Sequence, residues 1–338
     1  CDLDIVNRIG AAFGFAQFMH AIPALQNAGK RPMEDIQAAA ERIAPYVSRT
    51  PVLKAPRFNH LAKGDFYLKC EHLQMTGAFK ARGAMNTVLV HKEEALENGV
   101  LTHSSGNHGA ALSWAAAQIG AKAYVVMPSN APKAKIASVE YYGGIVTFCE
   151  PTLEARETTA EQVRKNTGAL LIHPYDNYNI IAGQATATYE LLHEQPDLDQ
   201  IFVPVGGGGL LAGAALANSY FGKAKVIGCE PTIANDAFKS FTSGTWTPAK
   251  STDTIADGLK TSLGHKNFPI IQEHVDRITL LSEDEIQEGW HSCLETIKQF
   301  IEPSAGTGIA AAMREETHGK TGIILCGGNM DVRGFTLR

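Results

Sequence analysis

The chain has 338 residues, of which 44% are hydrophobic and 19% are charged. This is the composition of an ordinary globular protein, and the length suggests about two domains. A net charge of −5 gives no basic footprint for nucleic acid. No apolar run reaches the length of about eighteen residues that a membrane span needs, so we expect neither a nucleic-acid nor a membrane partner.

The six cysteines form no C-x-x-C pair and fit neither a zinc site nor a disulfide framework. We therefore expect free thiols in a reducing compartment, which predicts a cytoplasmic protein. Residues 1–34 are predicted to be an N-terminal extension, either a surface amphipathic helix or the remnant of a processed organellar targeting segment. Asp2 and Asp4 count against targeting, because transit peptides are poor in acidic residues.

From Pro32 onward, short apolar segments alternate with helical ones. Helices are predicted over 33–46, from after the loop that carries Lys80 through Val90, and over 110–119, 134–142, 153–165, 210–221, 283–300 and 308–316. Strands are predicted over 66–70, 124–127, 145–149, 170–173, 201–205, 226–229 and 322–325. Such alternation is typical of an α/β fold with parallel sheets covered on both faces. Ligands of these folds lie at the carboxyl ends of strands, where glycine-rich turns lead into helices.

Lys80 lies in the segment Thr-Gly-Ala-Phe-Lys-Ala-Arg-Gly-Ala, residues 76–84. A single lysine is most often a solvated surface charge, and a chemical role needs evidence that it is buried in a site. Three glycine-rich turns elsewhere in the chain make Lys80 a candidate, because they could hold a phosphorylated cofactor against its amine.

The first of these turns is Gly206–Gly209, which follows the predicted strand 201–205 and opens a helix. Consecutive glycines let backbone N–H groups converge at a helix N-terminus, which favours phosphate. The turn lacks both G-x-G-x-x-G and the Lys-Ser/Thr of a P-loop, so a dinucleotide or ATP is disfavoured. A purely structural tight turn is the plain alternative.

The second turn, residues 103–109, reads His-Ser-Ser-Gly-Asn-His-Gly and also opens a helix. Capping the helix would need only one of its polar groups, whereas a site for a carboxylate or a ring hydroxyl would use several. The third turn begins at Cys326, after the last predicted strand. A small neutral side chain there could face a ring nitrogen, although a lone cysteine is more simply core filler.

Lys80 and the three turns, in this order and spacing, resemble the fold-type II pyridoxal-phosphate (PLP) enzymes, whose fold is tryptophan synthase β-like. The chain specifically resembles the serine racemase / serine–threonine dehydratase family, from about residue 50 to residue 331. The resemblance implies two parallel-sheet α/β domains with the cofactor between them. Residues 35–98 plus 177–338 would form a large PLP-binding domain, and residues 99–176 a small domain.

The resemblance also implies roles at the cofactor. Lys80 would carry PLP covalently, Phe79 would pack on its ring, Asn107 would bind the ring hydroxyl, Gly206, Gly207, Gly208 and Gly209 would hold the phosphate, Gly258 would lie beside the ring, and Cys326 would face the ring nitrogen. A neutral group at this nitrogen weakens the electron sink, which favours loss of a β-substituent over transamination.

For the substrate, the resemblance makes Ser105 a second catalytic residue, opposite Lys80 across the ring. Two groups on opposite faces would allow serine racemisation. Ser104, Asn107 and His108 would bind the substrate carboxylate together with Ser105. Arg156 matches an arginine that approaches the substrate, and a surface helix charge is an equally good interpretation of it.

Glu230, Ala234 and Asp236 resemble the divalent-cation site of the family. Carboxylate and carbonyl oxygens suit Mg²⁺ or Ca²⁺, and Mn²⁺ is a further option. Two acids at a strand end could instead be solvated. Glu302 matches a position near the cofactor, with capping of the following helix as the alternative.

Two departures concern the substrate. Ala78 replaces the usual serine before the lysine, and Cys326 replaces the usual serine or threonine. Related 3-hydroxyaspartate dehydratases share the Ala-Phe-Lys sequence. Animal serine racemases bind ATP with polar residues at four positions, which here are Ala55, Pro56, Met75 and Ala110. The sequence therefore gives no support to ATP as an effector.

We expect a PLP-dependent dehydratase that converts a serine- or threonine-type β-hydroxy amino acid into a 2-oxo acid and ammonia. Serine racemase activity and a homodimer are further expectations. The alternatives are a 3-hydroxyaspartate dehydratase and a β-replacement enzyme of the cysteine synthase type. A nucleotide-dependent dehydrogenase would need the G-x-G-x-x-G motif that the sequence lacks.

Overall fold

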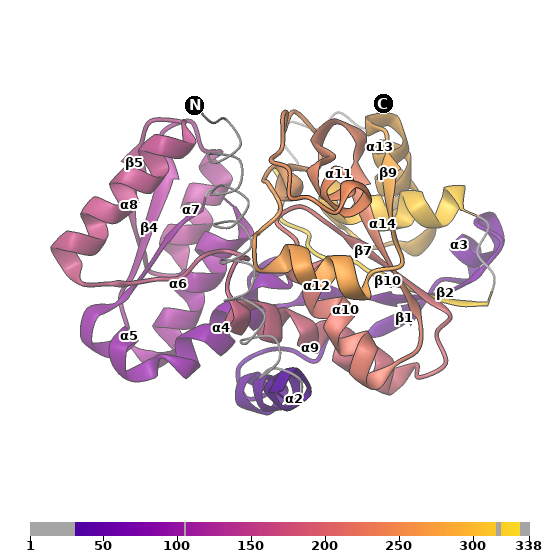
Figure 1. The fold of residues 1–338 in the computed structure, drawn as a ribbon, viewed down its shortest axis with the longest axis horizontal. Helices are drawn as coiled ribbons and strands as arrows, with labels where there is room; N and C mark the ends of the chain where they lie inside the picture. The colour runs from indigo at the N-terminus through magenta and orange to yellow at the C-terminus, as the bar shows by residue number, and fades with distance from the viewer. Residues whose placement is uncertain (1–30, 105, 316–318, 332–338) are drawn as a thin grey trace, which may run out of the picture.

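The computed structural model of the protein describes residues 31–104, 106–315 and 319–331. In this part of the chain the strands form two separate sheets, and helices pack around each of them (Figure 1). Most of the predicted N-terminal extension, residues 1–30, lies outside the described residues. The α/β fold with parallel sheets is confirmed.

The larger sheet has six strands. In spatial order they are β1 (Val52–Lys54), β2 (Asp65–Lys69), β10 (Lys320–Ile324), β7 (Gln200–Pro204), β8 (Lys225–Pro231) and β9 (Arg277–Leu281). The pairing of β1 with β2 is antiparallel and all the others are parallel. Helices α9 (Tyr178–Glu194), α10 (Gly209–Phe221) and α12 (Asn267–His274) lie on one side of the sheet, and α11 (Asp236–Ser243), α13 (Glu283–Ser292) and α14 (Pro303–Arg314) on the other (Figure 1).

The smaller sheet has four parallel strands. Their order is β5 (Gly144–Cys149), β4 (Ala123–Pro128), β3 (Val100–His103) and β6 (Leu170–Leu171), and the helices around them are α5 (Lys92–Asn98), α6 (Asn107–Ile119), α7 (Lys133–Tyr141) and α8 (Leu153–Thr167). Val125 packs with Val139 on one face, and its neighbour Val126 packs with Ala160 on the other. Burial on both faces explains why these strands read as continuous apolar runs rather than alternating ones.

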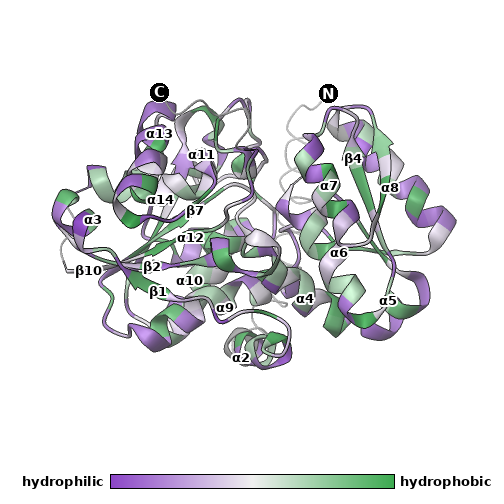
Figure 2. Ribbon diagram, turned by 180° about the vertical axis from the view of Figure 1, so that it is seen from behind, coloured by the Kyte–Doolittle hydropathy of each residue, from purple (hydrophilic) through white to green (hydrophobic). Residues whose placement is uncertain are grey.

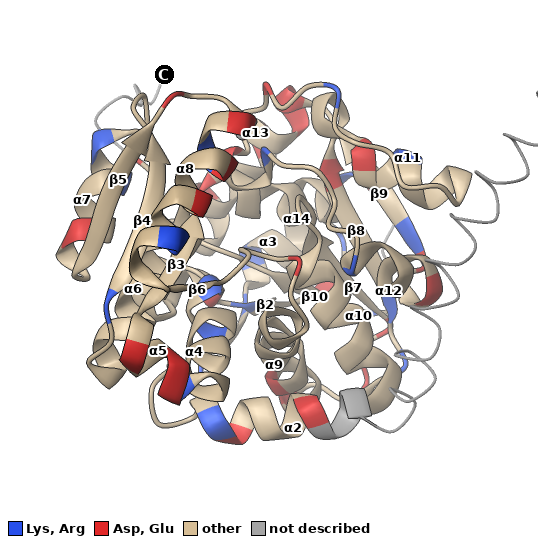
Figure 3. Ribbon diagram, turned by 60° about the vertical axis from the view of Figure 1, so that its left-hand side comes forward, with Lys and Arg blue, Asp and Glu red and all other residues tan. Residues whose placement is uncertain are grey.

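All four strands of the smaller sheet lie between Val100 and Leu171, within the predicted small domain. The exact division at residues 99 and 176 stays a prediction. Figure 2 shows that the strands of both sheets are largely hydrophobic and that the helices around them are of mixed polarity. Acidic and basic residues are interspersed over the outer helices (Figure 3). None of the helices in the described ranges has the length and apolarity that crossing a membrane would require.

Three predicted elements need correction. The helix predicted over 283–300 ends at Ser292, is followed by a π-helical turn (Cys293–Ile297), and stops at Lys298, whose φ of 64° is left-handed. No sequence signal marks this stop, because glycine or asparagine is the usual residue there.

The helix predicted to begin at 308 begins at Pro303, since proline suits the first turn of a helix. The predicted end of that helix, Glu316, is not among the described residues. The strand predicted over 170–173 is only two residues long, because the chain turns at His173, whose Nδ1 accepts the N–H groups of Tyr175 and Asp176.

Helix α4 (Lys80–Val90) joins the two halves of the molecule. It crosses α9 at two glycines, where a Cβ on Gly183 would lie 2.6 Å from the Cα of Gly83. On its other side, Ala84 and Met85 pack with Leu112 of α6. Helix α2 (Arg31–Ile43) packs against α9 and α4. The close crossing fixes the first residue of α4, Lys80, relative to both sheets.

Candidate active site

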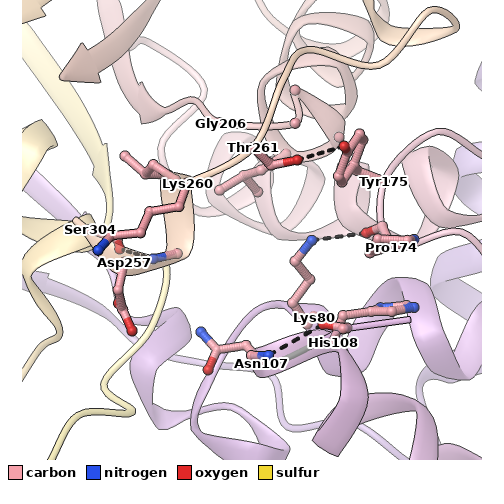
Figure 4. Close-up of a pocket in the computed structure, with 18 of the residues that line it drawn as sticks. Lys80, Asn107, His108, Pro174, Tyr175, Gly206, Asp257, Lys260, Thr261 and Ser304 are labelled. Carbon is pink, nitrogen blue, oxygen red and sulfur yellow. Dashed lines mark hydrogen bonds between the residues drawn. The ribbon is translucent and has the colours of Figure 1, made fainter. Parts of the chain in front are cut away.

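A cavity of about 410 Å³ lies where the strand ends of both sheets meet. Lys80, Asn107, Gly206 and several residues of other segments surround it (Figure 4). The structure brings together here every predicted cofactor residue and four of the five predicted substrate residues, Asn107 being in both sets: Phe79, Lys80, Ser104, Asn107, His108, Arg156, Gly206, Gly207, Gly208, Gly209, Gly258 and Cys326. Ser105 is not among the described residues.

Two hydrogen bonds position Lys80, one at the backbone just before it and one at the amine of its side chain. The N–H of the preceding Phe79 donates to the carbonyl of Cys326 (3.0 Å), which anchors the start of α4 to the end of β10. The Lys80 Nζ donates to the carbonyl of Pro174 at 2.9 Å (Figure 4). Burial lowers the pKa of this amine to about 8. Lys80 is thus partly neutral at physiological pH, as a nucleophile or base must be.

A buried ion cluster fixes the first turn of α4. The guanidinium of Arg82, two residues after Lys80, donates to both carboxylate oxygens of Glu71 (2.7 and 2.8 Å) and of Glu190 (2.7 and 2.8 Å). The Nζ of Lys69 completes the cluster at 2.7 Å from Glu190. Two cations and two anions balance, so no charge within this cluster is unpaired.

The glycine loop, residues 206–209, connects β7 to the first turn of α10. Gly208 has a φ of +88°, which side chains rarely adopt. A Cβ on Gly207 would lie 2.4 Å from the ring of Tyr175, and a Cβ on Gly206 would lie 2.8 Å from the Cα of Leu259. Only glycine fits these positions, and the bare backbone faces the cavity at a helix N-terminus, where an anion is favoured.

The opposite wall contains the amide of Asn107 and the carboxyl group of Glu302, and Asn107 also binds Asn329, which does not line the cavity. The Nδ2 of Asn107, the first residue of α6, donates to both oxygens of Glu302 (3.1 Å each). The Oδ1 of Asn107 accepts a hydrogen bond from Asn329 (3.0 Å). Burial and the nearby Asp257 raise the pKa of Glu302 to about 7. Glu302 makes no side-chain cap to α14, so the capping interpretation is wrong.

Cys326 and Gly258 complete the wall. Burial raises the pKa of the Cys326 thiol well above its usual range, so this group stays neutral. The N–H of Gly258 donates to Ser304 Oγ (2.8 Å), and a Cβ on Gly258 would lie 2.9 Å from the same oxygen. The site therefore combines a partly neutral lysine, an anion-binding loop and a neutral thiol.

Residues 43–327 match the family described as the pyridoxal-phosphate dependent enzymes. The chain belongs to this family. The serine racemase of Dictyostelium discoideum is 46% identical to it over 313 residues, which cover 90% of this chain and 96% of that protein. The L-threo-3-hydroxyaspartate ammonia-lyase of Saccharomyces cerevisiae is 42% identical over 306 residues, with coverages of 89% and 94%.

Among solved structures, that of maize serine racemase matches with a TM-score of 0.86 and 39% identity, over 89% of this chain and 94% of that chain. The prediction of a fold-type II PLP enzyme is therefore confirmed, as is the likeness to serine racemases and 3-hydroxyaspartate dehydratases. The residues present fit PLP, because a buried lysine lies in the same cavity as a loop whose backbone is bare of side chains.

Three histidines of this PLP enzyme border the cavity as neutral imidazoles. Burial lowers the pKa of His173 to about 4 and, together with the charge of Lys80, that of His108 well below its usual range. Burial also lowers the pKa of His103, whose ring lies edge-on to that of His173 at 5.7 Å. Because these imidazoles are neutral, they add no positive charge that would lower the pKa of the Lys80 amine further.

Arg156 lies at the rim of the cavity, in the first turn of α8. Its Nε donates to the carbonyl of Thr152 in the same helix (3.4 Å), and its charge helps to lower the pKa of His103. The side chain is half-buried. Its position is compatible with contact to a substrate, and this role stays a prediction.

The candidate metal residues lie at the carboxyl end of β8. Both oxygens of Glu230 accept backbone N–H groups, from Ala237 and Phe238 (2.8 Å each), and Asp236 accepts that of Leu263 (2.7 Å). Burial raises the pKa of Glu230, Asp236 adds to this effect, and burial raises the pKa of Asp236 to about 6. Among the described residues no group of three or more His, Cys, Asp or Glu side chains could hold a metal ion. Two neighbouring buried acids still fit a cation whose other ligands are carbonyls and water.

Sequence reasoning missed several residues of the cavity wall. Pro174 and Tyr175 follow the strand β6, and Thr261 binds the Tyr175 hydroxyl at 2.6 Å (Figure 4). Lys135 of α7 forms an ion pair with Asp257 across the cavity. Only the position of Pro174 and Tyr175, directly after a parallel strand, could have drawn attention to them.

Proposed function

We propose that this protein is a PLP-dependent dehydratase, which removes water from a serine- or threonine-type amino acid to give a 2-oxo acid and ammonia. Racemisation of serine is a second activity of the same site. The observation that carries the proposal is the position of Lys80, whose pKa is about 8, in one cavity with a bare glycine loop and a neutral thiol.

In this proposal Lys80 attaches the cofactor, Phe79 and Gly258 border its ring, the glycine loop binds its phosphate and Asn107 its ring hydroxyl. The bound cofactor supplies an electron sink for the substrate α-carbon. The amine of Lys80 takes the α-proton, for which its lowered pKa is suited. The thiol of Cys326 brings no negative charge to the ring nitrogen, which favours elimination.

The substrate carboxylate would bind Ser104, Ser105, Asn107 and His108 at the start of α6, where free N–H groups favour an anion. Ser105 would exchange a proton on the face opposite Lys80, and this second group is what racemisation requires. Arg156, at the rim, would approach the substrate from α8.

A second candidate is dehydration of 3-hydroxyaspartate, and a specific observation supports it. The cavity is lined by the cationic side chains Arg156 and Lys260 in addition to Lys80, and by Lys135, which is paired with Asp257. A substrate with a second carboxylate would find a partner in Arg156 or Lys260. Ala78, which this chain shares with the resembling 3-hydroxyaspartate dehydratases, is consistent with this substrate.

A product assay on the purified, PLP-loaded protein separates these functions. The substrates are L-serine, D-serine, L-threonine and the isomers of 3-hydroxyaspartate, and the assay measures 2-oxo acid and the enantiomers of serine together. Pyruvate or 2-oxobutyrate, with D-serine formed from L-serine, supports the first proposal. Oxaloacetate alone supports the second. No product from any of them would contradict both and favour β-replacement.

The variant Lys80→Ala tests the assignment of the lysine. It should lose both covalent PLP attachment and activity, whereas Lys133→Ala, an exposed lysine of α7, should keep both. Covalent PLP on Lys80→Ala would overturn the assignment.

A divalent cation, Mg²⁺ or alternatively Ca²⁺ or Mn²⁺, is proposed at Glu230, the carbonyl of Ala234 and Asp236. The support is the pair of buried acids, whose ionised forms need a compensating charge. EDTA should lower the melting temperature and the activity, and added Mg²⁺ should restore both. Unchanged values after EDTA would show that no functional cation binds.

A homodimer is also proposed. Leu73, Met75 and Phe300 are 51%, 40% and 46% exposed. Their segments are joined by the hydrogen bond between His72 and Gln299 (3.0 Å). Clustered exposed apolar side chains are typical of interfaces. Light scattering of the holoenzyme gives the oligomeric state directly. The absence of ATP activation and the cytoplasmic location stay predictions.

A further inference from the structure

Two segments far apart in the sequence, residues 173–177 and 261–267, enclose the glycine loop. The ring of Tyr175 occupies the place of a Gly207 side chain, 2.4 Å from the position of its Cβ. The Cδ1 of Leu263 similarly lies 2.5 Å from the Cβ position of Gly208. The loop is therefore packed between these segments and has little room to shift.

Asn267, the first residue of α12, binds the loop and the first segment at once. Its side chain is fully buried, and its Nδ2 donates to the carbonyl of Gly207 (2.6 Å) and to that of Tyr175 (3.2 Å). The N–H of Gly264 donates to the same Gly207 carbonyl (3.0 Å). Two donors thus fix the direction of one carbonyl in the loop.

Further hydrogen bonds hold the two segments together. The hydroxyl groups of Tyr175 and Thr261 lie 2.6 Å apart (Figure 4). The N–H of Lys266 donates to the Oδ1 of Asp176 at 2.6 Å. We call the set Tyr175, Thr261 and Asn267 the clasp.

The direction of the Gly207 carbonyl determines that of the next N–H group. In a trans peptide the carbonyl of one residue and the N–H of the following residue point in opposite directions. The described residues contain no cis peptide bond. Holding the Gly207 carbonyl against Asn267 and Gly264 therefore turns the N–H of Gly208 away from them, and Gly208 is one of the residues that line the cavity.

The other half of the Asn267 amide supports a role beyond stability. Its Oδ1 is buried and has no hydrogen-bond partner among the described residues. A buried acceptor without a partner costs free energy, so an asparagine here is a poor choice for stability alone. The polar contacts of the side chain all run through Nδ2, to the loop and to Tyr175.

We propose that Asn267 is a positioning residue that orients the Gly208 N–H toward the cofactor phosphate, and that the clasp retains the phosphate in the loop. The inference rests on the proposed function in placing the phosphate at Gly206–Gly209. Asn267 itself touches neither cofactor nor substrate. It acts through the Gly207–Gly208 peptide.

The test compares affinity for PLP with affinity for pyridoxal, which lacks the phosphate, by titrating the ligand-free protein and following the visible absorbance of the bound ligand. Asn267→Ala should weaken PLP binding by about 10-fold to 100-fold, because the loss of one hydrogen bond to a charged group typically lowers affinity by this factor. Binding of pyridoxal should stay at the wild-type value. A proportional loss for both ligands, or no loss for PLP, would overturn the proposal.

The matched control is Asn218→Ala, in the last turns of α10. Asn218 is also a buried asparagine bound to the backbone, at the N–H and carbonyl of Ala224 (3.1 and 2.7 Å). Its loss should lower the melting temperature and leave both affinities unchanged. A comparable loss of PLP affinity in this control would show that general destabilisation explains the effect of Asn267→Ala, and that Asn267 has only a structural role.

Two further variants distinguish an error in this proposal from an error in placing the phosphate at the glycine loop. Gly208→Ala forces a side chain into a φ of +88°, and unchanged PLP affinity in it would show that the loop does not hold the phosphate. Tyr175→Phe removes only the hydroxyl bond to Thr261, and it keeps the test valid if Asn267→Ala does not fold. It should speed PLP dissociation without affecting pyridoxal, and a wild-type dissociation rate would overturn the clasp.

Discussion

The surroundings of Lys80 determine the pKa of its amine and therefore its reactivity. Its amine is buried next to a carbonyl and forms no ion pair with any residue that the structure describes, so desolvation dominates and lowers its pKa from 10.5 to about 8. The anionic form of Glu302 works in the opposite direction and limits the effect. The balance leaves a lysine that is neutral often enough to react and charged often enough to deliver a proton.

This pKa predicts how PLP attachment to the ligand-free protein depends on pH. Attachment needs the neutral amine, so its rate should rise with pH through a midpoint near 8 and then level off. A stopped-flow series over pH measures this rate, and a lysine peptide under the same conditions is the reference. A protein midpoint as high as that of the peptide would contradict the burial of Lys80.

Glu302 predicts a second pH effect, on stability. Its pKa in the folded protein is raised from 4.5 to about 7, so the folded state binds more protons than the unfolded state between these values. Its contribution is fully present below pH 4.5 and is lost as pH rises through 7. The loss is roughly 3 kcal/mol.

Chemical unfolding of the ligand-free protein at several pH values tests this. Between pH 5 and 8 the stability of Glu302→Gln, which cannot ionise, should rise relative to that of wild type, because only wild type loses the contribution of Glu302. The comparison concerns the slope with pH, because the substitution also alters the hydrogen bonds to Asn107 and Asn329. Equal slopes would show that Glu302 ionises as an ordinary carboxyl group.

Buried ion pairs anchor the first turn of helix α4 to neighbouring segments. Its apolar face is interrupted by Arg82, which reaches Glu71 before the helix and Glu190 on α9. These bonds join three segments at the turn that carries Lys80. Removing one partner from such a cluster is strongly destabilising, because it leaves a charge buried without a partner.

Arg82→Met should therefore cost about 3 to 5 kcal/mol of unfolding free energy, since Glu71 would stay buried without its partner. Adding Glu71→Met should recover part of this loss, because Glu190 keeps Lys69. Urea unfolding measures both. The exposed pair of Arg164 with Glu161 gives the matched control, and Arg164→Met should cost less than about 1 kcal/mol.

At the level of elements, local pattern predicted what depends on neighbours in sequence. Apolar runs located β4, β5, β7 and β8, and four consecutive glycines located the loop before α10. The partners of Arg82 and the clasp could not be predicted, because Glu190 and Asn267 carry no signal until folding brings them close. The stop at Lys298 could not be predicted either, because its φ of 64° is one that glycine or asparagine usually adopts.

The candidate site divides in the same way. Residues within the three turns and next to Lys80 were predictable from their spacing and the family resemblance. Pro174, Tyr175 and Thr261 were not, although Pro174 accepts the hydrogen bond of Lys80 itself. They belong to connecting segments, whose sequence tolerates many conformations until the cavity is assembled.

The two halves of the molecule are connected across the cavity by the ion pair between Lys135 on α7 and Asp257 on the larger side. Both side chains are partly exposed, 22% and 34%, so the pair is screened by solvent. Lys135→Gln should raise KM roughly two- to fivefold with a smaller change in kcat, because a weak pair helps to keep the cavity closed.

Steady-state kinetics on the substrate identified by the product assay measure this effect. Lys133→Gln, on the same helix and facing solvent, should behave as wild type. High salt should reduce the difference between Lys135→Gln and wild type. A change in kcat alone would place Lys135 in the chemistry and contradict a closing role.

Helix α4 lies between α9 and α6, and the chain between α4 and α9 forms the whole of the smaller sheet. The chain thus leaves and re-enters the larger half at neighbouring points, beside Lys80 and Pro174. A rotation of the smaller sheet would turn about this crossing as a hinge. Atoms at a hinge move least, so the entrance can widen for substrate while the group that carries the cofactor stays in place.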